Sequence, residues 1–202
     1  MKSWMKQIGC FCLCMFGCLL SVEAQENQVY EIPFDKGTLL LTPLQDNAVR
    51  IRYVEGEMKE LPEWVYVQTD NNDIKCKRKD TKAGVSLKLK QMSVIVDQQA
   101  KQLTATDRDG NVVFKAKAHE LKAATVQQEP TRDATLVIES PADEYLYGLG
   151  QFQDGYLNVR GLTRRLTQVN TQIAIPFLLS NKGYGLLWNN YGLTNFNPTT
   201  EK

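Results

Sequence analysis

The stretch QLTATDRDGNVVFKAK, residues Gln102–Lys117, places Asp109 and Gly110 between two segments rich in β-branched and apolar residues. An Asp-Gly pair supplies the positive φ angles that a tight hairpin turn demands. The stretch therefore predicts a β-hairpin, and this part of the chain is expected to be antiparallel β-structure.

Alternation of apolar and polar residues extends this interpretation along the chain. The period is two, as expected of half-buried strands, and no segment repeats apolar residues at helical spacing. Glycines and prolines, Pro33 and Pro43 among them, are expected to fall between strands. The pattern predicts an all-β fold, an antiparallel β-sandwich without a substantial helix. The four clearest segments are Ala48–Val54, Val85–Lys90, Met92–Asp97 and Ala134–Ser140.

The first 24 residues are interpreted as a secretory signal peptide. Lys2 and Lys6 precede the apolar run Ile8–Leu20, and small residues near Ala24 follow it. The run is shorter than the roughly 20 residues that a membrane span requires. We therefore predict cleavage after Ala24, export to the periplasm or the extracellular space, and one domain over residues 25–202. A buried N-terminal helix and a lipid anchor on Cys18 are the alternatives.

Composition excludes several classes of function. The chain has 24 basic and 23 acidic residues, so it presents no excess charge of the kind that binds nucleic acid. After the signal peptide it keeps one cysteine, Cys76, and one histidine, His119. Catalytic triads, metal sites and intrachain disulfides need more of these residues, so no metal and no cofactor are expected. We interpret His119 and Cys76 as ordinary strand residues.

Carboxylates offer few candidates for acid–base chemistry. Asp143 and Glu144 are adjacent, so in an extended chain they would point to opposite faces and could not act as a pair. Asp107 and Asp109 belong to the predicted hairpin turn. Asp154 is the best single candidate, although a structural role in an Asp-Gly turn is the favoured interpretation. No catalytic residue is assigned.

Glycines interrupt an aromatic run in YLYGLGQFQDG, residues Tyr145–Gly155, and predict that a strand breaks there. The motif lacks the third glycine and the following helix of a dinucleotide-binding turn. From here onward amides and aromatic rings gather on predicted loops, as they do in sites that hold sugars. These residues could equally terminate strands. They are Gln151, Phe152, Gln153, Asp154, Tyr156, Asn170, Thr171, Gln172, Trp188, Asn189, Asn190 and Tyr191.

Two landmarks between Tyr145 and Asn197 resemble the N-terminal β-sandwich domain of family 31 glycoside hydrolases, which include α-glucosidases and α-xylosidases. They are the turn Tyr147–Gly150 and, after Asn170, the Pro176–Phe177 strand with its Gly183–Gly185 hairpin. The resemblance implies a galactose-mutarotase-like supersandwich that packs against a (β/α)8 barrel. In the family, that barrel supplies two catalytic aspartates for retaining hydrolysis of α-glycosides.

The family's sandwich carries an Asn-x-Asp loop that helps to hold the substrate. By this resemblance Asn170 matches the Asn, Thr171 the variable position and Gln172 the Asp, with the loss of a charge. Gln151 stands where many members have Glu, and an amide keeps the reach but loses the ion pair. The resemblance thus implies substrate contacts for Asn170, Thr171, Gln172 and Gln151, with Phe152 and Asp154 close to the same pocket.

Three hypotheses about function follow. In the first, the chain is the N-terminal part of an exported α-glycosidase for α-glucosides or α-xylosides. The polar tail after Trp188 shows no closing strand, and we expect the sandwich to be incomplete and inactive without its barrel. In the second, the chain is a free-standing, secreted carbohydrate-binding module. In the third, it only braces a barrel.

Overall fold

The computed structural model describes residues 28–57, 62–65, 67 and 74–197. The predicted signal peptide, residues 1–24, lies outside the described residues. Within the described ranges the secondary structure is fourteen β-strands and no helix, which confirms the all-β prediction. The same part of the chain accordingly contains no helix that could cross a membrane.

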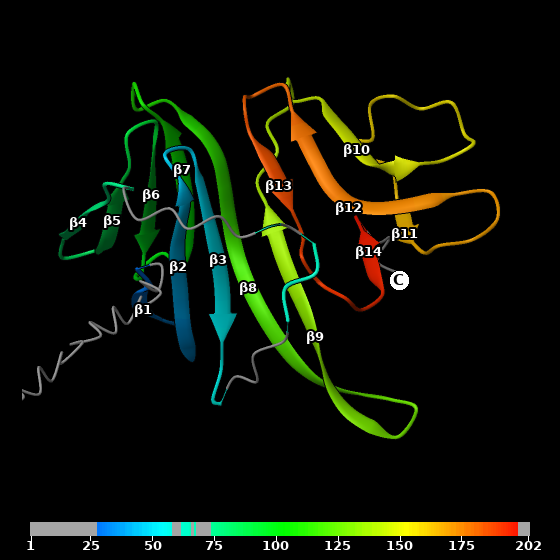
Figure 1. Cartoon of the computed structure of the whole chain (residues 1–202), viewed down its shortest axis with the longest axis horizontal. Coiled ribbons are helices and arrows are strands. Elements are labelled where there is room, and N and C mark those ends of the chain that lie inside the picture. The colour runs from blue at the N-terminus through cyan, green and yellow to red at the C-terminus, as the bar shows by residue number, and fades with distance from the viewer. Residues whose placement is uncertain (1–27, 58–61, 66, 68–73, 198–202) are drawn as a thin grey trace, which may run out of the picture.

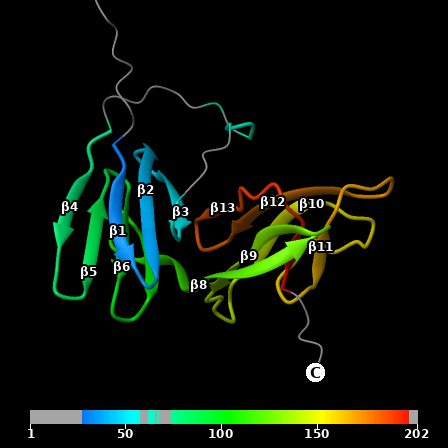
Figure 2. The ribbon, with the colours of Figure 1, turned by 90° about the horizontal axis from the view of Figure 1, so that it is seen from below.

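Two antiparallel sheets form the first half of the molecule. Each sheet follows the chain strand by strand, so neighbours in sequence are neighbours in space. Figure 2 shows these strands at one end of the molecule, from which β8 and β9 extend toward the other end. The three-stranded sheet comprises β1 (Tyr30–Phe34), β2 (Gly37–Gln45) and β3 (Ala48–Val54). The six-stranded sheet comprises β4 (Lys77–Asp80), β5 (Gly84–Lys88), β6 (Met92–Asp97), β7 (Gln102–Asp107), β8 (Val112–Val126) and β9 (Glu129–Ile138).

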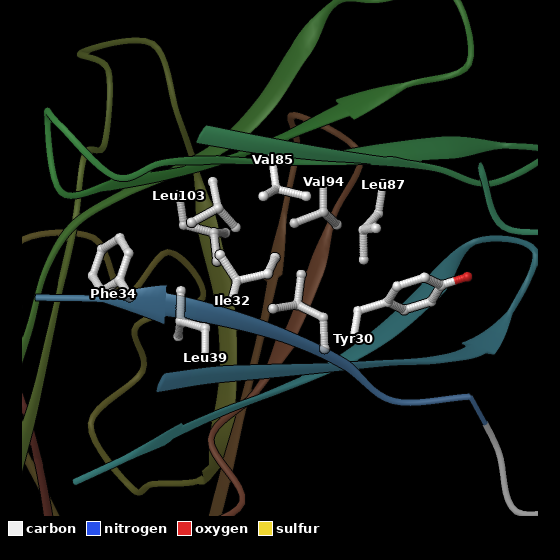
Figure 3. Packing of buried hydrophobic residues seen from close by; sticks show 10 residues of the cluster. Tyr30, Ile32, Phe34, Leu39, Val85, Leu87, Val94 and Leu103 are labelled. Carbon is white, nitrogen blue, oxygen red and sulfur yellow. The ribbon is translucent and has the colours of Figure 1, made fainter. Parts of the chain in front are cut away.

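The main hydrophobic core fills the space between these two sheets. Alternate residues of β1 point inward, as the buried–exposed alternation of that strand requires. Figure 3 shows them opposite side chains of β5, β6 and β7. Each fully buried Leu or Ile side chain contributes about 1.5–3 kcal/mol relative to an exposed one. The buried members of this core are Tyr30, Ile32, Phe34, Leu39, Leu41, Val85, Leu87, Val94, Val96 and Leu103.

The hairpin predicted over residues 102–117 is confirmed, and its turn is longer than a two-residue turn. Strands β7 and β8 pair antiparallel, and residues 108–111 connect them. Positive φ occurs at Gly110 but not at Asp109. Asp107 organises the loop instead, because its Oδ1 accepts from the backbone N–H groups of Asp109 and Asn111, both at 2.9 Å. These hydrogen bonds lower the pKa of the Asp107 carboxyl, that from the Asn111 side chain most of all.

The expectation that prolines fall between strands is wrong at three positions: Pro33, Pro43 and Pro130, the last of which lies near the start of β9, the outer strand of its sheet. Pro33 lies inside β1, which is an edge strand, so a residue without an N–H group costs no hydrogen bond on the free side. Pro43 lies inside β2 at the point where its pairing with β3 shifts register, next to Gln45. A bulge interrupts the ladder there, and proline is tolerated at such a site.

A second, smaller β-unit forms the other end of the molecule. Its three-stranded sheet has the order β10 (Leu146–Gln151), β12 (Ile173–Ser180), β13 (Gly185–Leu187), and beside it β11 (Arg164–Leu166) pairs with β14 (Thr194–Phe196). Figure 1 shows this unit in yellow to red. The short strand β14 was missed by the sequence analysis, which expected only a polar tail after Trp188. The buried core of the smaller unit comprises Leu146, Leu149, Val159, Leu166 and Leu178.

An aromatic contact joins this unit to the six-stranded sheet, and a buried carboxylate anchors the linker between β9 and β10. The ring of Tyr184, from the β12–β13 hairpin, packs edge-on against Phe114 of β8, with ring centroids 5.2 Å apart. Burial, and then the Glu144 carboxylate, raises the pKa of Tyr184. Glu144 is itself buried and accepts a hydrogen bond from Ser180 Oγ at 2.5 Å. The linker between β9 and β10 is therefore anchored in the interior.

The Gly-Leu-Gly motif does not break the strand, contrary to the sequence prediction. Strand β10 continues through Gly148, Leu149 and Gly150 as a β-bulge, at which its pairing with β12 shifts register. All three residues have positive φ. A Cβ atom on Gly150 would lie 2.0 Å from the carbonyl oxygen of Ile173. The close approach that excludes a side chain is thus to the neighbouring strand β12.

Candidate functional site

The predicted substrate loop is a tight turn between β11 and β12. Val169 and Gln172 pair across it, which leaves Asn170 and Thr171 exposed at its tip. The half-buried Gln172 holds the turn closed, because its Nε2 donates to the carbonyl oxygen of Thr167 (2.9 Å) and to Thr167 Oγ1 (3.0 Å). Asn170 and Thr171 therefore present an amide and a hydroxyl to solvent on a constrained backbone.

Gln151 lies next to this turn. It is the last residue of β10 and pairs with Ile173, the first residue of β12. Figure 1 shows the turn beside the end of β10, at the edge of the smaller unit. The structure thus brings Gln151 together with residues 170–172. The group can donate and accept hydrogen bonds but carries no charge, so it is suited to neutral hydroxyl groups such as those of a sugar.

Phe152 and Asp154 have internal partners instead. Arg164 of β11 is buried, forms an ion pair with Asp154 through its Nη1, and lies over the Phe152 ring at 4.1 Å from the centroid. The hydrogen bond from Arg164 lowers the pKa of the Asp154 carboxyl below its ordinary value of 3.8. This arrangement fixes the loop between β10 and β11. Arg164 could not be identified from sequence, because nothing marks it as buried.

The ion pair predicts a pH dependence of stability. Because the pKa of Asp154 is lower in the folded protein, the stabilisation is present above about pH 3.8 and is lost as the pH falls through the folded-state pKa. The variant Asp154→Asn should therefore be less stable than the wild type near neutral pH, and the difference should vanish in acid. Thermal unfolding of both proteins across this range measures it; a difference that does not change with pH would contradict the ion pair.

The contacts and burial of four further residues considered in the sequence analysis indicate structural roles. They are Glu144, Asp143, Cys76 and His119. Glu144 is buried, whereas Asp143 is exposed and pairs with Lys182, so the two acids point apart as predicted. Burial raises the pKa of the Cys76 thiol, which disfavours the reactive thiolate. The backbone of His119 pairs with Leu136 in β8–β9, and its side chain lies outside the described residues. No group of metal-ligating side chains occurs among the residues described.

An exposed apolar surface adjoins the turn, and the sequence analysis did not identify it. Alternate residues of β12, with one residue of β13, direct apolar side chains away from the smaller core. We call this surface the open face; its side chains are 37–51% exposed. Contiguous exposed apolar surface of this kind marks an interaction site in soluble proteins. The open face consists of Ile173, Ile175, Phe177, Leu179 and Leu187.

The open face continues into a large groove. The groove has a volume of about 1120 Å³ and lies between β3 on one side and β12 and β13 on the other, over β8 and β9. Its lining includes Ile51 and Tyr53 from β3 and Phe114 from β8, together with Phe177 and Leu187 of the open face. Among the described strands, β3 is the outer strand of its sheet on this side. The two sheets of the sandwich therefore enclose a core at one end and diverge around an uncovered surface at the other.

Comparison with known proteins relates this architecture to a family. The model of one protein family, described as "Glycosyl hydrolase 31 N-terminal galactose mutarotase-like domain", matches residues 38–197. An α-xylosidase of Saccharolobus solfataricus is 31% identical over 160 residues, which are 74% of this chain and 22% of the relative. The chain thus spans about a fifth of the length of this curated relative.

Solved structures agree on the fold. The α-xylosidase of Xanthomonas citri superposes with a TM-score of 0.74 at 22% identity, over 83% of this chain and 19% of that one. An α-xylosidase from a soil metagenome, solved in complex with xylose, gives 0.71 at 25% identity, over 84% and 28%. The open face, the groove and the turn therefore belong to a domain that in these enzymes occurs within a much longer chain.

Proposed function

The chain belongs to the glycosyl hydrolase 31 N-terminal galactose mutarotase-like domains, and from this premise we propose that it serves an exported α-glycosidase acting on α-xylosides. Its part is to pack against the rest of that enzyme and to shape the substrate site. The substrate class rests on the α-xylosidases among the relatives, that of Saccharolobus solfataricus and the soil-metagenome enzyme solved with xylose. The signal peptide proposed at residues 1–24 accounts for export. N-terminal sequencing of the secreted protein tests it, and the expected first residue is Gln25.

The single observation that supports this proposal is the open face. Five apolar side chains remain at least one-third exposed beside a groove whose walls are largely apolar. Leaving such a surface in water forgoes about 25 cal/mol for each Å² of apolar area that could be buried. We propose that further β-structure and the catalytic part of the enzyme cover the open face and the groove.

We propose that the turn at Asn170 and Thr171 contacts the substrate directly. Covering the open face would place another surface next to Ile173, and hence next to Gln151 and the turn. The amide and hydroxyl groups there can hydrogen-bond to sugar hydroxyls at the margin of the active site. Gln172 shapes the turn, and Phe152 and Asp154 act indirectly through Arg164, which fixes the adjoining loop.

Catalytic acids are not assigned to this domain. Near the turn, the carboxylate of Asp154 is held in its ion pair with Arg164. Glycoside hydrolysis by two carboxylates requires both to approach the scissile bond, one of them as an acid with a raised pKa. The lowered pKa of Asp154 is opposite to that requirement. We propose that the reacting groups belong to the catalytic part that covers the open face.

Substitution of Asn170 tests the role of the turn. The assay uses a chimera in which residues 38–197 replace the matching region of the Saccharolobus solfataricus α-xylosidase. Losing a hydrogen bond worth about 0.5–1.5 kcal/mol, Asn170→Ala should raise KM for an aryl α-xyloside about two- to tenfold and leave kcat nearly unchanged. Asn195→Ala, an exposed amide on β14, is the matched control. An unchanged KM for Asn170→Ala would mean that the turn is only scaffold.

A further inference from the structure

A short described segment, Pro62–Val65, is fastened against the residues that follow β13. Tyr191 OH accepts from the backbone N–H of Trp64 (3.2 Å) and donates to the carbonyl oxygen of Pro62 (3.2 Å). The segment is more than 120 residues from Tyr191 in sequence, so these contacts are a tertiary feature of the fold.

A carboxylate fixes the same segment from its other side. Glu63 is largely buried, accepts from Asn189 Nδ2 at 3.1 and 3.2 Å, and forms an ion pair with Arg50 of β3 at 3.3 Å. It also accepts from the backbone N–H of Val65 at 3.0 Å. The backbone on both sides of Trp64 is therefore held in place by charged and amide partners, and such hydrogen bonds are stronger than neutral ones.

Although its backbone is fastened, the Trp64 side chain is 78% exposed, and the Tyr191 ring is 53% exposed. A fixed backbone that presents an indole to water differs from an ordinary surface residue, since large aromatic rings gain most from burial. Asn190 is exposed next to Tyr191 and accepts from the backbone N–H of Gly192 through its Oδ1 (3.1 Å). Within the described residues its Nδ2 group has no hydrogen-bond partner, so it can donate to a ligand.

We propose that Trp64, Tyr191 and Asn190 form a carbohydrate-binding platform, separate from the turn at Asn170. The rings contact the apolar face of pyranose units in a glucan chain, and the Asn190 amide hydrogen-bonds to their hydroxyls. The ligand is expected to be uncharged, because Glu63 and Arg50 pair with each other and hold the loop in place. This platform does not depend on the proposed α-glycosidase function.

Titration of the full chain with xyloglucan oligosaccharides tests the platform, with dextran fragments as a second probe and tryptophan fluorescence as the readout. Trp64 and Trp188 are the tryptophans of residues 25–202. The wild type should bind with Kd of about 1 mM or tighter. Trp64→Ala should bind at least about fivefold more weakly, and Trp64→Phe should recover part of the loss. Isothermal titration calorimetry follows the variants that lack Trp64.

Two further variants separate the platform from a general effect. Tyr191→Phe keeps the ring but removes the hydroxyl that fastens the loop, so it should weaken binding less than Trp64→Ala. Tyr145→Ala removes another exposed aromatic side chain and should bind as the wild type does. Absence of binding by the wild type up to about 10 mM, or equal binding by Trp64→Ala, overturns the proposal. Neither result bears on the role of Asn170, which is measured by KM.

Discussion

Gly150→Ala is expected to lower the free energy of unfolding by about 3–5 kcal/mol, a large fraction of the 5–15 kcal/mol typical of a domain. The added Cβ would lie 2.0 Å from the carbonyl oxygen of Ile173 and 2.8 Å from the backbone nitrogen of Ile175. Both atoms belong to β12, so relief of the clash requires the strands to separate at the bulge. The residue would also be strained at its φ of +102°. Urea unfolding followed by circular dichroism measures the change.

Gly155→Ala is the matched control. Gly155 also has positive φ, at +74°, but a Cβ there meets nothing within 4 Å. It should therefore cost only the conformational strain, about 1 kcal/mol. Equal destabilisation by the two variants would mean that backbone conformation, and not contact with β12, requires glycine at position 150.

The double variant Ile175→Lys, Leu179→Lys is expected to reduce α-xylosidase activity of the chimera more than tenfold. Both residues lie on the open face and are about half exposed in the chain alone. If the rest of the enzyme covers this face, two ammonium groups must be buried without partners, and each costs several kcal/mol. A cost of 1.4 kcal/mol already corresponds to a factor of ten. Activity per folded molecule and the yield of folded protein are both measured.

Val112→Lys provides the control for added charge. Val112 is 56% exposed at the start of β8, next to the β7–β8 turn, and lines neither the open face nor the groove. This variant should keep the activity and yield of the parent chimera. If the double variant also does so, the open face is not buried in the joined protein, and the proposed packing is wrong.

Local sequence patterns predicted the strands in which apolar and polar residues alternate. Ala48–Val54 and Met92–Asp97 are strands with the bounds expected from alternation, because each has one face on the core. The hairpin around Gly110 was also predicted, since short-range turn chemistry determines it. The family resemblance implied substrate contacts for Gln151 and for the Asn170 turn, and only the pairing of β10 with β12 shows that the two lie side by side.

Features that depend on distant partners were missed. From the local sequence, Gly148 and Gly150 predicted the end of a strand. In the structure, β10 continues through them as a bulge because it pairs with β12. Arg164 became recognisable only with Asp154 and Phe152 around it. Trp64 lies more than 120 residues from Tyr191, which holds its segment. In each case the property belongs to a contact between segments, and composition and periodicity report only on one segment at a time.

Hydroxyl-radical footprinting tests the central proposal most directly, because it measures the solvent exposure of individual side chains. The peptide spanning Ile173–Leu179 should be oxidised rapidly in the chain alone and several-fold more slowly in the active chimera, where the open face is covered. Trp64 should be oxidised at the same rate in both. Equal oxidation of residues 173–179 in the two proteins would contradict the proposal that this face packs against the rest of an α-glycosidase.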